Sequence, residues 1–264
     1  MLISKNKGGK SSLKLWETQT WYDLEKIESK TAILPVGSIE QHGPHLPLAT
    51  DLIIAEEIAK KVSEQIDAYL LPILPYSCSK EHLGVPGTIS LRSTTLLILL
   101  ADIFQSLEQS GVKYLGVVYW HGGNVPVFKK YEVTIKSARK YTLEENGIEE
   151  KEKLEVEFLN PWKFLREQFV ELFGKKDLHA GAIETSLILH LRPELVRLNL
   201  AVNEWDDRVI DNLDDLPWTL LSESGVLASN IEQSSAEKGE SLLKLSVEAI
   251  TNHIISKFQA PKMF

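Results

Sequence analysis

The chain has 264 residues, of which 43% are hydrophobic and 25% are charged, a composition that suits one globular domain with a full apolar core. Its formal net charge of −8 argues against a general attraction to nucleic acid or to anionic membranes. The single cysteine, Cys78, excludes an internal disulfide framework and a cysteine-based zinc site.

The first residues are lysine-rich, and no apolar segment of the kind found in a signal peptide follows them. We therefore expect residues 1–15 to form a flexible N-terminus. The longest apolar run lies around Leu96 to Leu100 and is too short to cross a bilayer. The sequence thus predicts a single cytoplasmic domain over residues 1–264.

Four short apolar runs have the composition of buried β-strands. They are rich in β-branched and apolar residues and are ended by glycine, proline or polar residues. These runs are residues 31–37, 69–74, 114–119 and 155–159.

Longer segments with helical periodicity separate and follow these runs. In residues 52–66, for example, Ile54, Ile58 and Val62 fall on one helix face. Gly111 stands where the C-terminal cap of a helix over 95–109 belongs. The predicted helices are residues 52–66, 95–109, 127–142, 162–173, 182–191 and 236–258.

Strand–helix alternation of this kind predicts an α/β fold with a mostly parallel central sheet covered on both faces. Residues 203–233 are acidic and irregular, and we expect them to be rich in loops. They are either an inserted flap or a contact between subunits.

Polar residues gather after the first predicted strand, at the sheet edge where parallel sheets bind ligands. Glu40, His42, His45 and Asp51 lie within twelve residues of a loop rich in Gly and Pro. Glu40 and His42 are two residues apart, so in an extended segment their side chains emerge on the same side. Carboxylate oxygen and imidazole nitrogen together suit zinc, manganese or iron.

Two of these residues have structural alternatives. Asp51 immediately precedes a helical pattern, so it is either the N-cap of that helix or a ligand, and the two roles are compatible. A lone histidine such as His45 is more often a hydrogen-bonded loop residue than a metal ligand.

A second polar loop follows the third strand and reads His121-Gly122-Gly123-Asn124. The glycines let the backbone approach a ligand closely, and their amides are candidates for binding a substrate oxyanion. Alternatively, the loop is a tight strand-to-helix turn with Asn124 as N-cap. A lipase-like oxyanion loop also begins with His-Gly-Gly, but the chain contains no Gly-x-Ser-x-Gly motif, so a serine hydrolase with that nucleophile elbow is excluded.

Two further loops carry histidines. His179 and Glu184 flank the start of the predicted helix at 182–191. In the first turn of this helix, the negative charge of Glu184 would also interact favourably with the helix dipole. His82 follows the second strand and either orients the substrate or braces its loop. Cys78, in the same loop, is interpreted as a packing residue, because a reactive thiol needs a lowered pKa.

Four stretches resemble, in order, the motifs of the creatininase family of metal-dependent amidohydrolases. They are LPVGSIEQHGPHLPLATD, EHLGVPGTISL, HGGN and LHAGAIETS, which lie between residues 34 and 186, and AEKG near Ala236 is a weaker match. The resemblance implies a three-layer α/β/α fold, a centre with one or two divalent metal ions, and a homo-oligomer, often a hexamer.

The resemblance also assigns roles by motif position. It implies that the metal ligands are Glu40, His42, Asp51, His121 and Glu184, with Asp51 bridging if two ions bind. His179, or a carboxylate such as Glu184, would transfer the proton to the leaving nitrogen. Zinc is the favoured ion, with manganese and iron as alternatives.

This chain departs from the family pattern at two places in the third motif. The family commonly has Asn-Gly before the histidine, whereas this chain has Tyr119-Trp120, two bulky aromatics that we expect to reshape the pocket. Creatininase itself carries a metal-binding Glu two residues after that histidine, and here the position is Gly123. Creatinine is therefore not the predicted substrate.

These observations predict a hydrolase that uses metal-activated water to cleave a small non-peptide amide, either a cyclic amide or a formamide. Substrate contacts are expected from His82, Gly122 and Gly123. One alternative is a two-metal phosphoester hydrolase, which requires basic residues near the site, where the sequence offers only Lys80 and Arg92. Another is a catalytically silent metal-binding assembly protein.

Overall fold

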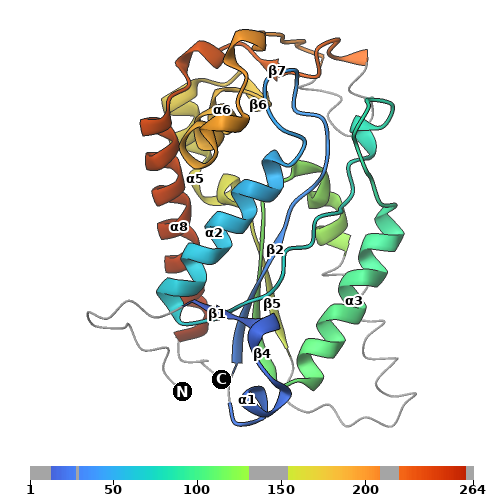
Figure 1. Cartoon of the computed structure of the whole chain (residues 1–264), viewed down its shortest axis with the longest axis vertical. Coiled ribbons are helices and arrows are strands. Elements are labelled where there is room, and N and C mark those ends of the chain that lie inside the picture. The colour runs from blue at the N-terminus through green and yellow to red at the C-terminus, as the bar shows by residue number, and fades with distance from the viewer. Residues whose placement is uncertain (1–12, 28–29, 131–153, 209–219, 260–264) are drawn as a thin grey trace.

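A computed structural model describes residues 13–27, 30–130, 154–208 and 220–259. Its centre is a five-stranded sheet in which every paired strand is parallel, with the order β1-β3-β2-β4-β5 (Figure 1). The strands are β1 (Lys14–Leu15), β2 (Lys30–Val36), β3 (Tyr69–Leu70), β4 (Val112–Tyr119) and β5 (Glu155–Leu159).

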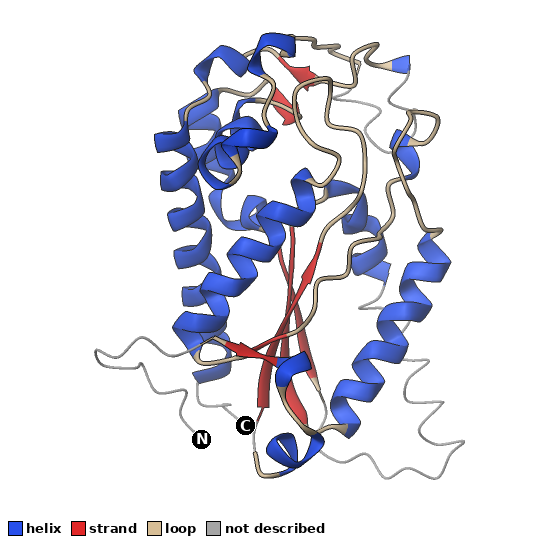
Figure 2. Cartoon of the chain, in the orientation of Figure 1, coloured by secondary structure: helices blue, strands red, loops and turns tan. Residues whose placement is uncertain are grey.

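Helices cover both faces of the sheet, as Figure 2 shows. They are α1 (Trp21–Glu25), α2 (Thr50–Ile66), α3 (Ser93–Gln109), α5 (Pro161–Phe173), α6 (Ala182–Leu191) and α8 (Ala236–Gln259). The predicted parallel sheet between two helical layers is confirmed.

The strand residues alternate between two hydrophobic cores, as the period of two requires. Ile33, Leu70, Val118 and Leu159 enter the core that α2, α5, α6 and α8 share. Their neighbours Ala32, Leu34, Tyr69, Val117 and Phe158 enter the core under α3, together with Leu96, Leu100 and Phe104. The strands are therefore buried on both faces, which accounts for their nearly continuous apolar sequence.

Element ends follow from local chemistry. Asn160 caps α5 by accepting a hydrogen bond from the Trp162 amide at 2.8 Å, and Pro161 occupies the first turn. After α3 the chain turns through Gly111 with a φ of 82°, which places this glycine just past the helix end as expected.

Three sequence expectations change. Lys14 and Leu15, expected to belong to a flexible N-terminus, form β1 and pair with β3. The strand predicted over 69–74 is regular only at Tyr69–Leu70, because Pro72 has no amide to continue the ladder; backbone bonds from Leu71 and Leu74 keep the segment beside β2. The helix predicted over 127–142 is present at residues 125–130, and the rest of it lies outside the described residues.

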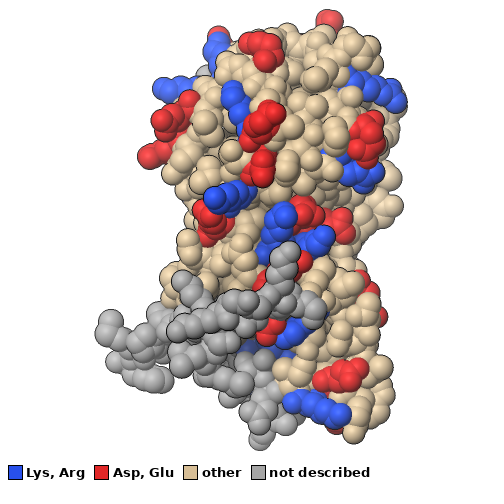
Figure 3. Space-filling model, turned by 60° about the vertical axis from the view of Figure 1, so that its left-hand side comes forward, with Lys and Arg blue, Asp and Glu red and all other residues tan. Residues whose placement is uncertain are grey.

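A second, small antiparallel sheet pairs β6 (Asp177–His179) with β7 (Leu227–Ala228) near the carboxyl ends of the central strands. Its second strand comes from the 203–233 region, whose described part is otherwise loops and short turns, as predicted. Figure 3 shows acidic and basic side chains intermingled on one face of the molecule. Within the described segments, no helix has the length and apolarity needed to cross a membrane.

Candidate metal centre

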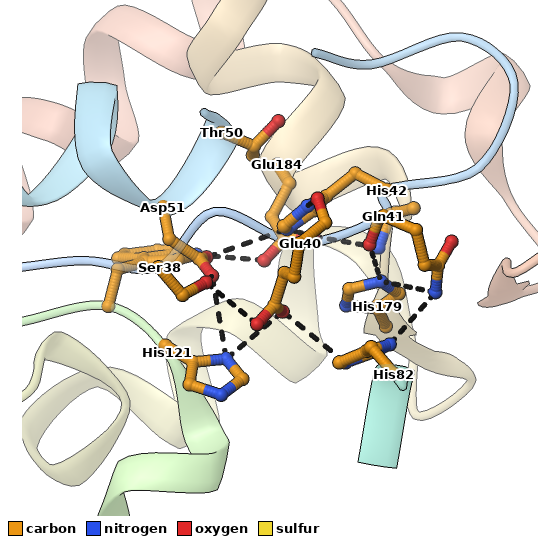
Figure 4. A network of polar contacts seen from close by, with 12 residues as sticks. Ser38, Glu40, Gln41, His42, Thr50, Asp51, His82, His121, His179 and Glu184 are labelled. Carbon is orange, nitrogen blue, oxygen red and sulfur yellow. Dashed lines mark hydrogen bonds and ion pairs between the residues drawn. The ribbon is translucent and has the colours of Figure 1, made fainter. Parts of the chain in front are cut away.

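Buried acidic and imidazole side chains from four separate loops meet beyond the carboxyl ends of β2 and β4 (Figure 4). The loop after β2 and the first turn of α2 supply Glu40, His42 and Asp51, while His121 follows β4. Glu184 lies in the first turn of α6. The structure therefore brings together all five residues that the family motif indicated as ligands, in the place where parallel sheets bind ligands.

One group consists of Glu40, Asp51 and His121. The Nδ1 atom of His121 lies 3.0 Å from Glu40 Oε1 and 3.4 Å from Asp51 Oδ2. The other ring nitrogen, Nε2, donates to the Cys78 carbonyl at 2.9 Å. Because this bond fixes the proton on Nε2, Nδ1 is the atom available as a ligand.

A second group consists of His42, His179 and Glu184, whose ligand atoms lie within 4.8 Å of one another. His42 Nδ1 donates to the Glu40 carbonyl at 3.1 Å, so its Nε2 faces the centre. That Nε2 lies 3.5 Å from Asp51 Oδ1 and 3.8 Å from Glu184 Oε2. Asp51 thus directs one oxygen toward each group, the arrangement that a bridging carboxylate needs.

The donor set fits divalent cations. Glu40 Oε1 and His42 Nε2 are buried and make no hydrogen bond of acceptable geometry. Buried polar atoms of this kind normally have a partner, and a bound cation would supply one. Burial opposes the charged form of His42, but Asp51, Glu184 and Glu40 outweigh it and raise its pKa to about 9. The pKa of His121 is likewise raised, because Glu40 and Asp51 outweigh its burial. The three carboxylates therefore favour positive charge at their centre.

Ser38 is a component that sequence reasoning missed. Its hydroxyl lies 2.7 Å from Glu40 Oε2 and 2.7 Å from Asp51 Oδ2, and it is fully buried. Its single proton serves one carboxylate at a time, so Ser38 holds the two acids side by side. The signal was available, since Ser38 precedes Glu40 by two residues and shares its side of an extended segment.

Glu184 is held on both oxygens. Its Oε2 accepts a 2.7 Å bond from the Ala180 amide, and its Oε1 accepts a 2.8 Å bond from the Trp120 indole. Ala180 has a φ of 51°, an uncommon value for a residue with a Cβ, in the turn that leads into α6. Burial and the charge of Asp51 raise the pKa of Glu184 to about 7 against the opposing effects of His42, Trp120 and Ala180.

Replacing Trp120 with phenylalanine should therefore lower the stability of the protein and its affinity for metal, although no ligand is removed. The substitution leaves Glu184 Oε1 buried without its donor, which costs about 1–3 kcal/mol in free energy of unfolding. We expect lower stability in urea denaturation of the metal-free protein, together with weaker zinc retention. Trp162, whose ring packs 6.4 Å from that of Trp120, is the matched control in the same aromatic cluster. Equal losses in Trp120→Phe and Trp162→Phe would contradict a specific role for the indole bond.

The two aromatics before His121 are separated by the sheet. Tyr119 enters the core under α3 and packs edge-on against Phe128 with ring centroids 4.7 Å apart. Trp120 enters the opposite core and reaches Glu184. Of these two aromatics, only Trp120 contacts a candidate ligand. The effect on the pocket that we expected from both residues is therefore assigned to Trp120 alone.

His82 and Gln41 complete the wall of the site. His82 Nε2 lies 3.3 Å from Glu40 Oε1, and its ring stacks on His179 at 4.5 Å. The Gln41 amide nitrogen lies 2.9 Å from His82 Nδ1 and 3.0 Å from the Gly225 carbonyl. Gln41 was missed in the sequence, and its contact with Gly225 shows that the 203–233 region contributes to the site.

The remaining residues have identifiable places. Asp51 lies inside the first turn of α2 rather than at its N-cap, which is Ala49. His45 Nε2 lies 3.1 Å from the Thr185 hydroxyl, and burial lowers the pKa of His45 to about 4, consistent with a loop residue. The Asn124 side chain accepts from the Cys78 amide at 3.2 Å.

Cys78 and the two glycines lie beside His121. Cys78 is buried with its sulfur 3.4 Å from the Ser93 hydroxyl, in keeping with a packing role. Gly122 is exposed, whereas a side chain at Gly123 would collide with its surroundings.

Comparison with known proteins identifies the family of this chain. A family model described as creatinine amidohydrolase matches residues 17–254. A creatinine amidohydrolase from Pseudomonas putida is 29% identical over 264 residues, which is 90% of this chain and 95% of that protein. A mycofactocin precursor peptide peptidase from Mycolicibacterium smegmatis is 34% identical over 168 residues, which is 61% of this chain and 58% of that protein.

Solved structures give the same result. A zinc–zinc form of a creatininase variant and a manganese creatininase each have a TM-score of 0.77 and 26% identity, and cover 95% of this chain and 100% of their own. Because the family match extends over nearly the whole chain, this protein belongs to the creatininase family.

Proposed function

We propose that this protein is a metal-dependent amidohydrolase that cleaves the C–N bond of a small non-peptide amide, either a cyclic amide or a formamide. The observation that carries the proposal is the pair of buried ligand groups, with Asp51 between them directing one oxygen to His42 and the other to His121. A structural role alone does not account for three carboxylates and four imidazoles gathered at one edge of the sheet.

In this proposal Glu40, Asp51 and His121 would hold one divalent ion, and His42, Asp51 and Glu184 would hold a second. Zinc is the first choice and manganese the next, in line with the metals of the related creatininase structures, and iron also suits these ligands. When bound, such ions lower the pKa of coordinated water from ~15.7 to about 7 and polarise a carbonyl oxygen.

His179 is the proposed proton carrier. Its ring lies 4.4 Å from that of His42, and its Nε2 donates to the Gln41 carbonyl at 2.8 Å. Burial and the neighbouring His42 and His82 lower the pKa of His179 well below the usual value, so the imidazole is neutral at pH 7. A neutral imidazole can take a proton from the attacking water and then deliver it to the leaving nitrogen.

Substrate contacts are assigned to the wall of the site. His82 and Gln41 offer polar atoms beside Glu40, and the backbone amides of Gly122 and Gly123 are candidates for the oxyanion that forms during attack.

A peptide bond is the second candidate, favoured by the similarity to the mycofactocin precursor peptide peptidase. A phosphoester receives less support, since the basic side chains Lys80 and Arg92 are both exposed to solvent. A silent assembly protein would bind metal without turnover.

The test is hydrolysis by zinc- and manganese-loaded protein of a panel that contains cyclic amides, formamides, short peptides and a phosphodiester, each with a chelated sample as control. Chelator-sensitive cleavage of a cyclic amide or formamide supports the proposal. Cleavage of the peptides alone moves the function to the second candidate. Metal binding with no cleavage across the panel favours the assembly protein.

A further inference from the structure

Glu81 lies on the outer side of His121, away from the candidate ligand atoms. It belongs to the short turn Lys80–His82 in the loop after β3. Its Oε1 lies 3.4 Å from His121 Nε2, the same nitrogen that donates to the Cys78 carbonyl at 2.9 Å. The Nε2–H of His121 therefore faces a carbonyl and a carboxylate together, while Nδ1 faces Glu40 and Asp51.

Gly123 leaves the space that this carboxylate occupies. A Cβ at position 123 would collide with Glu81 Oε1 and His121 Nε2 and would lie 2.6 Å from the Cys78 carbonyl oxygen. All three distances are far below van der Waals contact, and two of the three atoms are those that fix the ring. Glycine is therefore required here because of space, and any side chain would displace Glu81, His121 or the Cys78 backbone.

We propose that Glu81 is a positioning residue for His121, and that Gly123 is required so that the Glu81 carboxylate can reach the ring. The proposal rests on the proposed function, in which His121 is a metal ligand. It assigns a role to Glu81, which sequence reasoning did not select. It also explains why position 123 is a glycine, since a side chain there would occupy the space of the Glu81 carboxylate.

The physical effect follows from the imidazole itself. A carboxylate against Nε2–H holds the ring orientation, keeps the proton on Nε2 and makes Nδ1 a better electron donor. Glu81 acts through His121, since it belongs to none of the groups of three ligand atoms that the described residues form. Loss of such a partner typically lowers metal affinity by roughly 10–100-fold.

The experiment measures zinc affinity of the metal-free full-length protein by competition with a chromophoric chelator, and visible absorption after loading with Co²⁺. Glu81→Gln keeps the size of the side chain and an acceptor oxygen but removes the charge. Glu81→Asp keeps the charge but withdraws it from the ring. Glu64→Gln, at an exposed position on α2, is the matched control for the loss of one negative charge.

We expect both Glu81 variants to bind zinc about 10-fold or more weakly at one site, with unchanged stoichiometry at saturation and a shifted Co²⁺ spectrum. Gly123→Ala should weaken binding at least as much. The Glu64 control should match the wild type. A variant that merely loosened the fold would lower the unfolding midpoint without moving the Co²⁺ bands of the protein that remains folded.

Wild-type affinity and an unchanged Co²⁺ spectrum in Glu81→Gln, or in Glu81→Asp if the first variant does not fold, would overturn the role of Glu81 and leave the proposed function intact. Failure of the wild type itself to bind zinc would overturn both. The two failures are therefore distinguishable in one set of titrations.

Discussion

Asp51→Asn is expected to remove both metal ions and to reduce amide hydrolysis to the background rate. Asp51 directs one oxygen to each ligand group, so a neutral amide in its place weakens both groups at once. Metal-ion catalysis contributes several kcal/mol to stabilisation of the transition state, so the expected loss is at least about 10³-fold in kcat/KM. Metal content and the steady-state rate are measured on the same preparation.

The control for this variant lies on the same helix. Asp67 follows the last turn of α2 with a φ of 57°, a conformation that asparagine also tolerates, and it pairs with Lys14 far from the ligand groups. Asp67→Asn should leave metal content and rate unchanged. Full metal occupancy in Asp51→Asn would refute the bridging assignment.

His179→Ala is expected to keep its metal and lose turnover. His179 contacts His42 and the Gln41 backbone, whereas the proposed ligand sets, Glu40 with Asp51 and His121 and His42 with Asp51 and Glu184, do not include it. Removal of a positioned acid–base group typically lowers kcat by roughly 10²–10⁴-fold. The measurement compares kcat, KM and metal content, with His190→Ala at the far end of α6 as control. If His179→Ala kept full activity, the proton-transfer assignment would be wrong, and if it lost its metal, His179 would be a ligand instead.

Much of the fold is predictable because the signals are local. The segment Ala182–Leu191 was predicted with both ends correct, since Gly181 stands before the helix and Pro193 shortly after it. Strand β5 also matches its predicted bounds. The second strand was predicted too long, because an apolar run has no feature that distinguishes a hydrogen-bonded ladder from an extended segment broken by Pro72.

The ligand set was indicated by the resemblance to the creatininase family, although its residues lie far apart in the chain. In a parallel sheet the loops after all strands meet at one edge, so Glu40 and His121 could be expected to approach each other from the strand pattern alone. The strand pattern does not show which Asp51 oxygen faces His42 and which faces His121; only the three-dimensional structure shows this.

The contacts of the supporting residues were not predicted, for a physical reason. The Trp120 indole reaches Glu184 across 64 positions of sequence, and Gln41 reaches the Gly225 carbonyl across 184. Trp and Gln occur in many environments, and their local sequence does not predict which distant residue they contact. The Glu81–His121 contact belongs to the same class, since it becomes visible only when the space above Gly123 is known.

The central claim is that this chain holds metal at the ligand groups that meet on Asp51. The most direct test is the metal content per chain of protein purified without added metal or chelator, with Glu40→Ala as the control variant. We expect one to two equivalents in the wild type and, in the variant, the loss of at least the ion held by the first ligand group, to which Glu40 belongs. Absence of metal in the wild type, even after reconstitution with zinc, manganese and iron, would contradict the hydrolase proposal.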